Sequence, residues 1–233
     1  MVGVVIPNSK RIRSKRIKNK PSNIRYFFYL MLVLMVVMVF LLPYLEFKGL
    51  IDLSNTLALD SIAFSFIFPL IAFSYLFYKG NSMQEVIREL GLSIDKLKAR
   101  YILTGIGLFA LFFIIQILAG IIEYITGYNI STNVASLLAG LPLYFYIFAF
   151  LIAPINEEIL FRGFMVPRFG VVISALIFGA LHYLSYFSIA EFVAALLFGL
   201  AAGYVLKKTT SLYPSIVGHI LFDFVNILIL LNI

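Results

Sequence analysis

Two adjacent carboxylates and a guanidinium interrupt an apolar stretch in the second half of the chain. Glu157, Glu158 and Arg162 stand among Ile, Leu and Phe in "APINEEILFRGF", residues 153–164. Ionisable side chains within a membrane segment are expensive and usually mark a site or an ion pathway. In a helix, Glu158 and Arg162 would share one face, four residues apart, and could pair. Glu157 would point about 100° away, so the pattern predicts a free carboxylate beside a structural ion pair.

Two later apolar stretches carry the other candidates for chemistry. His182 ends "FGALH", and "HILFDF" contains both His219 and Asp223; these are the 2 histidines of the chain. His219 and Asp223 also share a helical face, so either Asp223 accepts the imidazole N–H or both side chains point into one cavity. A single buried polar residue is commonly a helix–helix contact. Ionisable groups on three successive polar-bearing segments indicate instead one shared site within the membrane.

The composition indicates that these stretches cross a bilayer. Hydrophobic residues make up 62% of the 233 residues and charged residues 12%, against about 45–50% and about 25% in soluble domains. Backbone groups that face lipid must be hydrogen-bonded within their own segment, which favours helices. The sequence therefore predicts an all-α, polytopic membrane bundle. At about 20 apolar residues per helix we expect about seven transmembrane helices, near residues 26–45, 60–78, 101–122, 141–161, 170–186, 189–206 and 212–231.

The distribution of basic residues predicts the orientation. Residues 10–25 hold eight of the 18 Lys and Arg and no acidic residue. With the N-terminus inside, 17 of the 18 fall on the cytoplasmic side, as the positive-inside rule requires. We expect residues 1–25 to form a basic cytoplasmic tail that contacts anionic lipid headgroups, and residues 26–233 to form a single transmembrane domain. No aromatic residues interleave the basic ones, so nucleic acid is not an expected partner.

One cytoplasmic loop, residues 82–100, is long enough to hold structure of its own. Its apolar residues from Met83 to Leu90 recur at helical spacing, with Ser82 as a suitable N-cap and Gly91 as a helix break. The pattern predicts an amphipathic helix that lies in the membrane interface.

Three motifs carry a resemblance to one family. "EEILFR" (157–162), "FGALH" (178–182) and "HILFD" (219–223) resemble, in order and spacing, the motifs EExxxR, FxxxH and Hxxx(N/D). These motifs belong to the CAAX prenyl endopeptidase type II and bacteriocin-processing family (CPBP, or Abi) of intramembrane proteases. The resemblance covers roughly residues 135–231, which we take as the motif-bearing core of the transmembrane domain.

The resemblance implies a role for each site residue. Glu157, assisted by His182, would activate the water that attacks a peptide bond, and His219 with the residue at 223 would bind the oxyanion. A carboxylate removed from water is a stronger base, which suits Glu157. Prenyl-processing members commonly have Asn where this chain has Asp223, and an ionised Asp cannot donate a hydrogen bond. Asp223 would then be protonated, orient His219 or ligate a metal, and Asn226 could supply an amide donor instead.

Whether the site holds a metal ion stays open at this level. Glu157, His182 and His219 could form a zinc set, but HExxH is absent and no imidazole lies near the glutamates in sequence. The chain has no cysteine, which excludes thiolate nucleophiles and thiolate metal ligands. From the helical rise, Glu157 and His219 would lie roughly 8–10 Å below the cytoplasmic edge. We therefore expect an integral protein of the cell membrane whose site opens toward the cytoplasm.

The predicted function is that of an intramembrane endopeptidase that processes the C-termini of prenylated, CAAX-type proteins. The lipid chain of such a substrate would dissolve in the bilayer and bring the scissile bond to the site. Cleavage of signal or bacteriocin-like peptides is an alternative, and so is a non-catalytic self-immunity or sensor role. A membrane transporter that uses the buried carboxylates as proton relays is a further alternative, although such transporters usually show internal repeats and none is visible here.

Overall fold

The protein is a bundle of α-helices in the computed structural model, which describes residues 24–50, 56–127, 138 and 140–231. Within these ranges there is no β-strand, which confirms the predicted all-α fold. The basic tail expected for residues 1–25 lies almost wholly outside the described residues. The π-helical segments η2 and η3 and the 3₁₀ turn η1 interrupt the α-helices. In chain order the elements are α1 (Ile24–Phe47), α2 (Thr56–Tyr78), α3 (Met83–Glu89), η1 (Ile94–Lys96), α4 (Ala99–Thr126), α6 (Leu143–Ile147), η2 (Phe148–Ile152), α7 (Ala153–Glu158), η3 (Ile159–Met165), α8 (Val166–Tyr186), α9 (Ile189–Thr209) and α10 (Tyr213–Leu231).

Long apolar helices dominate the described part of the chain, as a polytopic membrane protein requires. Five of them are long and apolar enough to cross a bilayer: Ala58–Tyr78, Ala99–Thr126, Leu143–Tyr186, Ile189–Thr209 and Tyr213–Leu231. A shorter apolar stretch, Tyr26–Leu41, lies within α1. The predicted span 170–186 and all but the first two residues of the predicted span 141–161 fall within the single 44-residue run Leu143–Tyr186. The total of seven bilayer crossings stays a prediction.

A sharp reversal at Gly170 divides that 44-residue run into two limbs. Gly170 has φ 84° and ψ 168°, a backbone region that is essentially restricted to glycine. The Ser174 hydroxyl donates a hydrogen bond to the Phe161 carbonyl at 2.5 Å, although 13 residues of straight helix would separate them by about 20 Å. The rings of Phe161 and Phe178 are likewise only 4.9 Å apart. Residues 143–169 and 171–186 therefore lie side by side.

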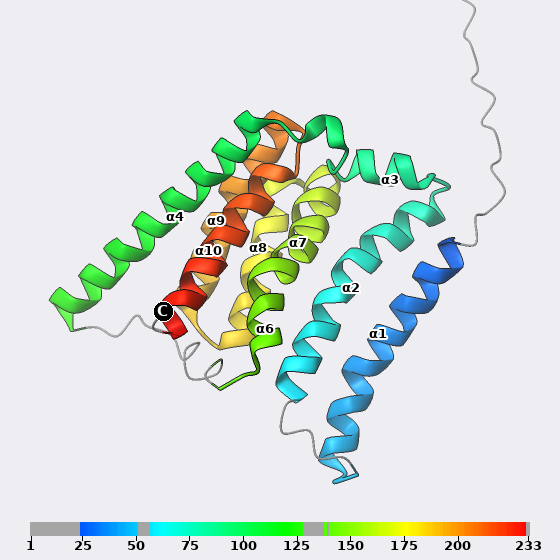
Figure 1. Ribbon diagram of the computed structural model, residues 1–233, viewed down its shortest axis with the longest axis horizontal. Coiled ribbons are helices and arrows are strands. Elements are labelled where there is room, and N and C mark those ends of the chain that lie inside the picture. Colours follow the sequence, from blue (N-terminus) through cyan, green and yellow to red (C-terminus); the bar gives the residue numbers. More distant parts are fainter. Residues whose placement is uncertain (1–23, 51–55, 128–137, 139, 232–233) are drawn as a thin grey trace, which may run out of the picture.

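The helices are arranged around the limb that carries the acidic pair (Figure 1). α1 and α2 pair on one side of the bundle, α4 lies on the opposite side, and α6 to α10 occupy the space between them. Glycines allow the closest helix contacts. A Cβ on Gly105 of α4 would lie 2.6 Å from the carbonyl oxygen of Pro214 in α10, and one on Gly199 of α9 would lie 2.9 Å from Cβ of Ala175 in α8. These contacts fix α10 and α8, the helices that carry the histidines.

The loop between α2 and α4 folds onto one end of the bundle. α3 begins after the N-cap Ser82, whose side chain forms a capping box with Glu85, and the chain turns at Gly91 with φ 77°. These features confirm the predicted helix and its break. The side chain of Leu90 is fully buried, and the Gly91 carbonyl accepts a hydrogen bond from the Leu212 N–H at 3.0 Å. The apolar face of α3 therefore packs on the bundle at the turn between α9 and α10.

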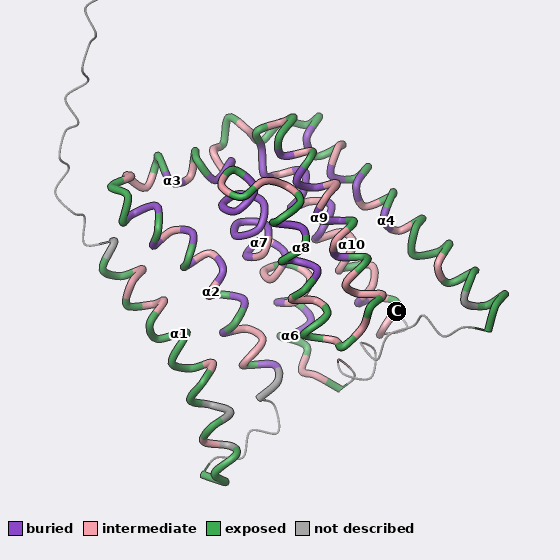
Figure 2. The backbone as a smooth tube through the Cα atoms, turned by 180° about the vertical axis from the view of Figure 1, so that it is seen from behind, coloured by how far each residue is buried: buried purple, intermediate pink, exposed green. Residues whose placement is uncertain are grey.

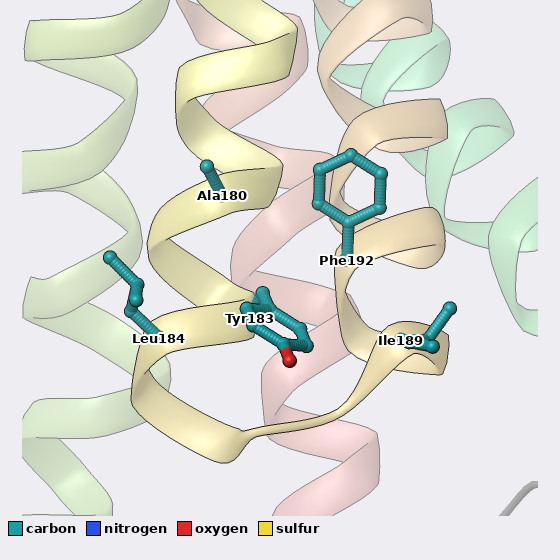
Figure 3. Close-up of a pocket in the computed structure, with 5 residues that line it drawn as sticks. All are labelled: Ala180, Tyr183, Leu184, Ile189 and Phe192. Atoms are coloured by element: carbon teal, nitrogen blue, oxygen red, sulfur yellow. The ribbon is translucent and has the colours of Figure 1, made fainter.

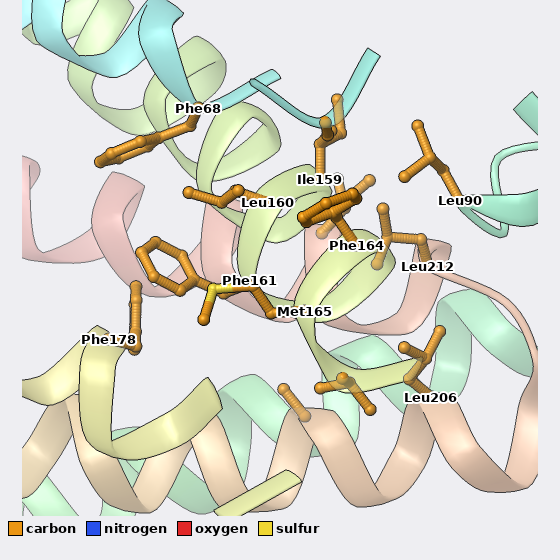
Figure 4. Packing of buried hydrophobic residues seen from close by; sticks show 14 of the residues in the cluster. Phe68, Leu90, Ile159, Leu160, Phe161, Phe164, Met165, Phe178, Leu206 and Leu212 are labelled. Atoms are coloured by element: carbon orange, nitrogen blue, oxygen red, sulfur yellow. The ribbon is translucent and has the colours of Figure 1, made fainter. Parts of the chain in front are cut away.

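The main hydrophobic core surrounds η3. Figure 2 shows buried residues gathered around α7 and the segment that follows it, and along the inner side of α2. Figure 4 shows η3 side chains meeting residues from α2, the α3 loop, α8, α9 and the α9–α10 turn. The labelled members are Phe68, Leu90, Ile159, Leu160, Phe161, Phe164, Met165, Phe178, Leu206 and Leu212. This core packs the limb with the acidic pair against α8, α9 and the start of α10.

Candidate active site

Glu158 and Arg162 form a fully buried ion pair. Glu158 Oε1 lies 3.1 Å from Arg162 Nη1, and the two side chains are 0% and 1% exposed. Neither Nη atom makes a further hydrogen bond within the described part of the chain. The guanidinium Cζ lies 4.0 Å from the ring centroid of Phe178 and 5.2 Å from that of Phe198. Aromatic faces attract a cation, and more strongly so away from water. The two rings therefore stabilise a guanidinium that water does not reach.

The same carboxylate of Glu158 holds His219. His219 Nδ1 lies 3.0 Å from Glu158 Oε1, although the two residues are 61 positions apart in the chain. Because Glu158 is paired with Arg162 as a carboxylate, it accepts this hydrogen bond and Nδ1 carries the hydrogen. The imidazole also contacts the ring of Phe198, with centroids 4.9 Å apart. Glu158 therefore fixes both the tautomer and the orientation of His219.

Asp223 does not orient His219 by a hydrogen bond. Its Oδ2 is 3.7 Å from His219 Nε2, which is beyond hydrogen-bonding distance. Of the two sequence-level options, the geometry favours the one in which both side chains face a common space. Asp223 is 31% exposed on its side chain, so this space is accessible from outside the protein.

Glu157 faces that same space. Its Oε2 lies 3.8 Å from His219 Nε2, on the opposite edge of the imidazole from Glu158, and its side chain is 20% exposed. The separation of the two acids follows from the helix, because one residue of advance rotates the side chain by about 100°. α7, which carries both acids, lies between the π-helical segments η2 and η3. Such π-bulges occur frequently at functional sites.

His182 approaches the site from α8. Its Nδ1 lies 3.0 Å from the carbonyl oxygen of Phe178, one turn earlier in the same helix. A carbonyl can only accept, so Nδ1 carries the hydrogen and Nε2 of the neutral ring is an acceptor. The Phe178 ring contacts both imidazoles, with its centroid 4.4 Å from that of His182 and 6.0 Å from that of His219. Phe178 is thus the common packing partner of both histidines and of Arg162.

Asn226 does not bring an amide donor to the site, and the described residues form no metal site. Asn226 accepts a hydrogen bond from Gln116 Nε2 at 2.5 Å and donates one to the Phe222 carbonyl at 2.9 Å. Its hydrogen bonds therefore tie α10 to α4 rather than to Glu157 or His219. Among the described residues, no group of three or more Asp, Glu or His side chains is placed to hold a metal ion. The described residues therefore do not assemble the zinc set suggested by the sequence.

The site coincides with a match to a known protein family. Residues 139–225 match the family model described as type II CAAX prenyl endopeptidase Rce1-like. This segment is therefore similar to the Rce1-like domain of that family. The match confirms the resemblance to the CPBP family and supports a membrane-embedded protease. No match was found among curated proteins or among solved structures.

The matched segment holds the whole polar set. Both acids, Arg162, both histidines and Asp223 fall within the matched residues 139–225, whereas α1 to α4 precede them. Asn226 lies one position beyond the match. The helices outside the domain contribute packing, including α2, whose Ser65 accepts a hydrogen bond from Asn156 at 3.1 Å just before the acidic pair.

Sequence reasoning did not single out Tyr186, whose ring packs beside that of His182. Tyr186 follows His182 by one turn of α8, and the two ring centroids are 6.2 Å apart. The signal was present, because Phe178, His182 and Tyr186 continue one helical face at intervals of four residues. The sequence alone does not distinguish it from the other tyrosines, of which the chain has 14 in all.

A groove on the outer side of the α8–α9 hairpin is distinct from this polar set (Figure 3). Its volume is about 480 Å³, and it is lined by Ala180, Tyr183, Leu184, Ile189 and Phe192. The lining is almost wholly apolar and contains none of the acids or histidines. Tyr183 follows His182 directly but lies on this other face of α8. His182 therefore lies on a different face of α8 from this groove.

Proposed function

We propose that the protein is an intramembrane endopeptidase in which Glu157 activates water for attack on a peptide bond. The observation that carries this proposal is the contrast between the adjacent acids. Glu158 is 0% exposed and is occupied by Arg162 and His219, whereas Glu157 is 20% exposed and lies 3.8 Å from an imidazole nitrogen. A general base has to reach a water molecule and has to be free to take its proton. Glu157 meets both conditions and Glu158 meets neither.

The reaction needs one proton transfer in each direction. Glu157 takes a proton from water as the water oxygen bonds to the peptide carbonyl carbon, and the carbonyl oxygen becomes an oxyanion. When the C–N bond breaks, the protonated Glu157 returns the proton to the leaving amine. His182 presents Nε2 as an acceptor, which suits it to hold the second hydrogen of the water. The site residues thus support hydrolysis without a covalent intermediate.

His219 and Asp223 form the other wall of the site. His219 Nε2 lies nearly equidistant from Glu157 and Asp223, at 3.8 and 3.7 Å. Its position is set from behind by Glu158, so the imidazole does not need Asp223 as a support. We assign His219 to polarising the substrate carbonyl when its ring is protonated, and Asp223 to holding that charge in place.

The substrate we propose is a membrane-anchored protein with a prenylated, CAAX-type C-terminus. The match to the type II CAAX prenyl endopeptidase family supports this class. A prenyl chain partitions into the bilayer, and the apolar helices of this chain place the acids and histidines among membrane segments. We propose that the protein lies in the cell membrane with its site open toward the cytoplasm. Lys96 donates a hydrogen bond to Thr210, just after Lys207 and Lys208, and Arg168 pairs with Glu89 on α3, so basic residues gather at one end of the bundle. The positive-inside rule assigns such an end to the cytoplasm.

Cleavage of a defined peptide by the purified full chain in phospholipid vesicles tests the proposal. The probe is a farnesylated peptide that ends in the C-a-a-X tripeptide extension, with a fluorophore and a quencher on either side of the scissile bond. The wild type should cleave it, and Glu157→Gln should lower kcat by about 10²–10⁴-fold, the usual contribution of a general base. Glu89→Gln makes the same chemical change on α3, away from the site, and should cleave like the wild type.

Two outcomes would overturn the proposal, each in a different part. Full activity of Glu157→Gln would remove the base from the mechanism. Equal cleavage of the farnesylated peptide and of its unmodified form would remove prenylated proteins as the substrate class, and preferential cleavage of a signal-like peptide would replace them.

A further inference from the structure

Two large apolar side chains lie on the surface of the segment that joins the membrane helices α2 and α4. Ile94 in η1 is 84% exposed, and Leu97, which follows η1, is 50% exposed. α3, the helix expected to lie in the membrane interface, instead buries Val86 and its C-cap Leu90 completely in the core of the bundle. The apolar surface that this segment offers to its surroundings therefore lies at η1.

The attachments of η1 hold it near the start of a membrane helix. Leu97 lies just before Ala99, the first residue of α4. The Lys96 ammonium donates a hydrogen bond to Thr210 Oγ1 at 2.5 Å, and the Ser211 hydroxyl donates one to the Lys96 carbonyl at 3.0 Å. These bonds fix η1 to the α9–α10 turn. Figure 1 shows the segment from α3 to the start of α4 at one end of the bundle.

Exposed tyrosines mark the level of the membrane surface at the same end. Tyr78, the last residue of α2, is 77% exposed, and Tyr204, near the end of α9, is 59% exposed. Lys208 Nζ lies 5.3 Å from the centroid of the Tyr204 ring. Tyrosine is enriched where a bilayer meets water, because its ring is apolar and its hydroxyl is polar. η1, which is tied to α9 and leads into α4, therefore lies in the interfacial region.

Basic residues surround the exposed apolar pair. Lys98 and Arg100 follow it in the chain, and Lys207 and Lys208 precede the turn to which η1 bonds; all four are exposed. Asp95 is the one acid within η1. Basic side chains beside a membrane helix are attracted to anionic headgroups, whereas a second copy of the chain would bring the same positive charge. The charges therefore favour an anionic lipid surface over a second copy as the partner.

A hollow beside Ile94 offers room for part of a lipid. Its volume is about 420 Å³, and its lining includes the apolar Ile87, Leu92 and Ile94 and the charged Arg88 and Asp95. A guanidinium can form two parallel hydrogen bonds with phosphate oxygens, and the Arg88 side chain is exposed. The hollow therefore combines apolar contacts for a lipid chain with a donor for its phosphate.

We propose that η1 and Leu97 form a membrane anchor that binds anionic phospholipid. Ile94 and Leu97 insert among the upper parts of the acyl chains. Arg88, Lys98 and Arg100 contact the phosphates. This surface lies outside the polar site, and its role does not depend on the proposed hydrolysis.

A single introduced tryptophan tests the depth of η1, because the chain has 0 Trp. The sample is the full chain with Ile94→Trp in vesicles of phosphatidylcholine and phosphatidylglycerol with brominated acyl chains, since bromine quenches tryptophan fluorescence on contact. Bromine near the headgroup end of the chains should quench Ile94→Trp about twofold or more strongly than bromine near the methyl end. Leu111→Trp is the matched control on α4, where Leu111 is 49% exposed and about 18 Å along the helix from Ala99. It should show the reverse order.

The choice of brominated lipid tests the charges. Bromine is placed on phosphatidylglycerol alone or on phosphatidylcholine alone, in vesicles that contain equal amounts of the two. Phosphatidylglycerol should be enriched about fivefold around Ile94→Trp, the magnitude for one basic residue at an anionic surface, and less so as salt is added. Lys98→Gln and Arg100→Gln together should bring this enrichment to within about twofold of none. Leu111→Trp should be quenched equally by the two lipids.

Several results would overturn the anchor. Absence of quenching of Ile94→Trp would place this residue in water or against protein, and emission that changes with protein concentration would assign the surface to a second copy. Equal quenching by the two lipids, or an enrichment that Lys98→Gln and Arg100→Gln leave unaltered, would remove the anionic headgroup from the proposal. None of these measurements uses peptide cleavage, so the proposed function and the anchor can fail separately.

Discussion

The polar site has a closed side, on which Glu158 lies, and an open side, on which the adjacent Glu157 lies. On the closed side, Glu158 and Arg162 are 0% and 1% exposed and are covered by Phe178 and Phe198. On the open side, the side chains of Glu157 and Asp223 are 20% and 31% exposed, and both lie within 4 Å of His219 Nε2. The imidazole separates the two sides, with Nδ1 facing one and Nε2 the other.

Two residues of the same type therefore differ in role because of where they lie on the helix: Glu158 is a structural partner of Arg162 and His219, and Glu157 is the exposed acid. A buried charge has to be paired, because an uncompensated one costs several kcal/mol. A reactive carboxylate has to keep a face free for water. The closed side satisfies the first condition and in doing so orients His219 for the open side. Changes on the closed side should therefore act mainly on stability, and changes on the open side mainly on kcat.

The largest effect on stability should come from breaking the buried pair. Glu158→Gln leaves the Arg162 guanidinium buried without a counter-charge, and we expect it to lower the free energy of unfolding by about 3–5 kcal/mol. Titration of the protein in dodecyl maltoside with sodium dodecyl sulfate measures this. Glu157→Gln, the neighbouring control, should change the same quantity by less than about 0.5 kcal/mol.

A double variant sharpens that comparison. Adding Arg162→Gln to Glu158→Gln removes the uncompensated charge, so part of the lost stability should return. If Glu157→Gln and Glu158→Gln destabilise the protein equally, the division into a closed and an open side is wrong.

A smaller loss of stability should come from adding a methyl group at Gly199 of α9, which packs behind Arg162. A Cβ on Gly199 would lie 2.9 Å from Cβ of Ala175 and 3.6 Å from Arg162 Nη2. Gly199→Ala should therefore destabilise the protein by about 1–3 kcal/mol, the usual range for overpacking. Gly107→Ala is the matched control, because nothing lies within 4 Å of a Cβ at Gly107, and it should not lower stability. Equal stability of the two variants would contradict the close packing of α8 on α9.

The smallest effect should come from an ion pair outside the site. Arg168 pairs with Glu89 on α3, and the two side chains are 20% and 40% exposed. Half-exposed pairs contribute about 0–1 kcal/mol, so Arg168→Gln should lower the free energy of unfolding by no more than that, and by less as salt is added. A loss as large as that of Glu158→Gln would mean that burial does not distinguish the two pairs.

Local sequence patterns predicted much of the helical framework. The helix after Ser82 and its end at Gly91 follow from capping and glycine geometry, which depend on neighbouring residues only. The proximity of Glu158 and Arg162 follows from helical periodicity in the same way. The break between the predicted spans 141–161 and 170–186 appears in the structure as the reversal at Gly170. The number of bilayer crossings stays a prediction, since it depends on where the membrane lies.

Contacts between distant segments could not be read from local patterns. The spacing of His219 and Asp223 left open whether the aspartate orients the imidazole or both point into one cavity, and in the structure Glu158, 61 positions away, orients the imidazole. Asn226, a candidate donor by spacing, instead bonds to Gln116 on α4. Tyr186 was overlooked although it continues the helical face of His182. Each of these depends on how helices rotate and approach one another, which a single segment does not encode.

The amino-acid sequence by itself determined that the chain is a membrane-embedded helical bundle with its few ionisable groups in three late segments, because hydrophobicity and helical period act over short distances. Only the tertiary structure decided which acid is locked in an ion pair and which one faces an open space beside His219. The reason is that burial and pairing are properties of several helices packed together, and the two environments lie only one residue, about 100° of helical rotation, apart on α7.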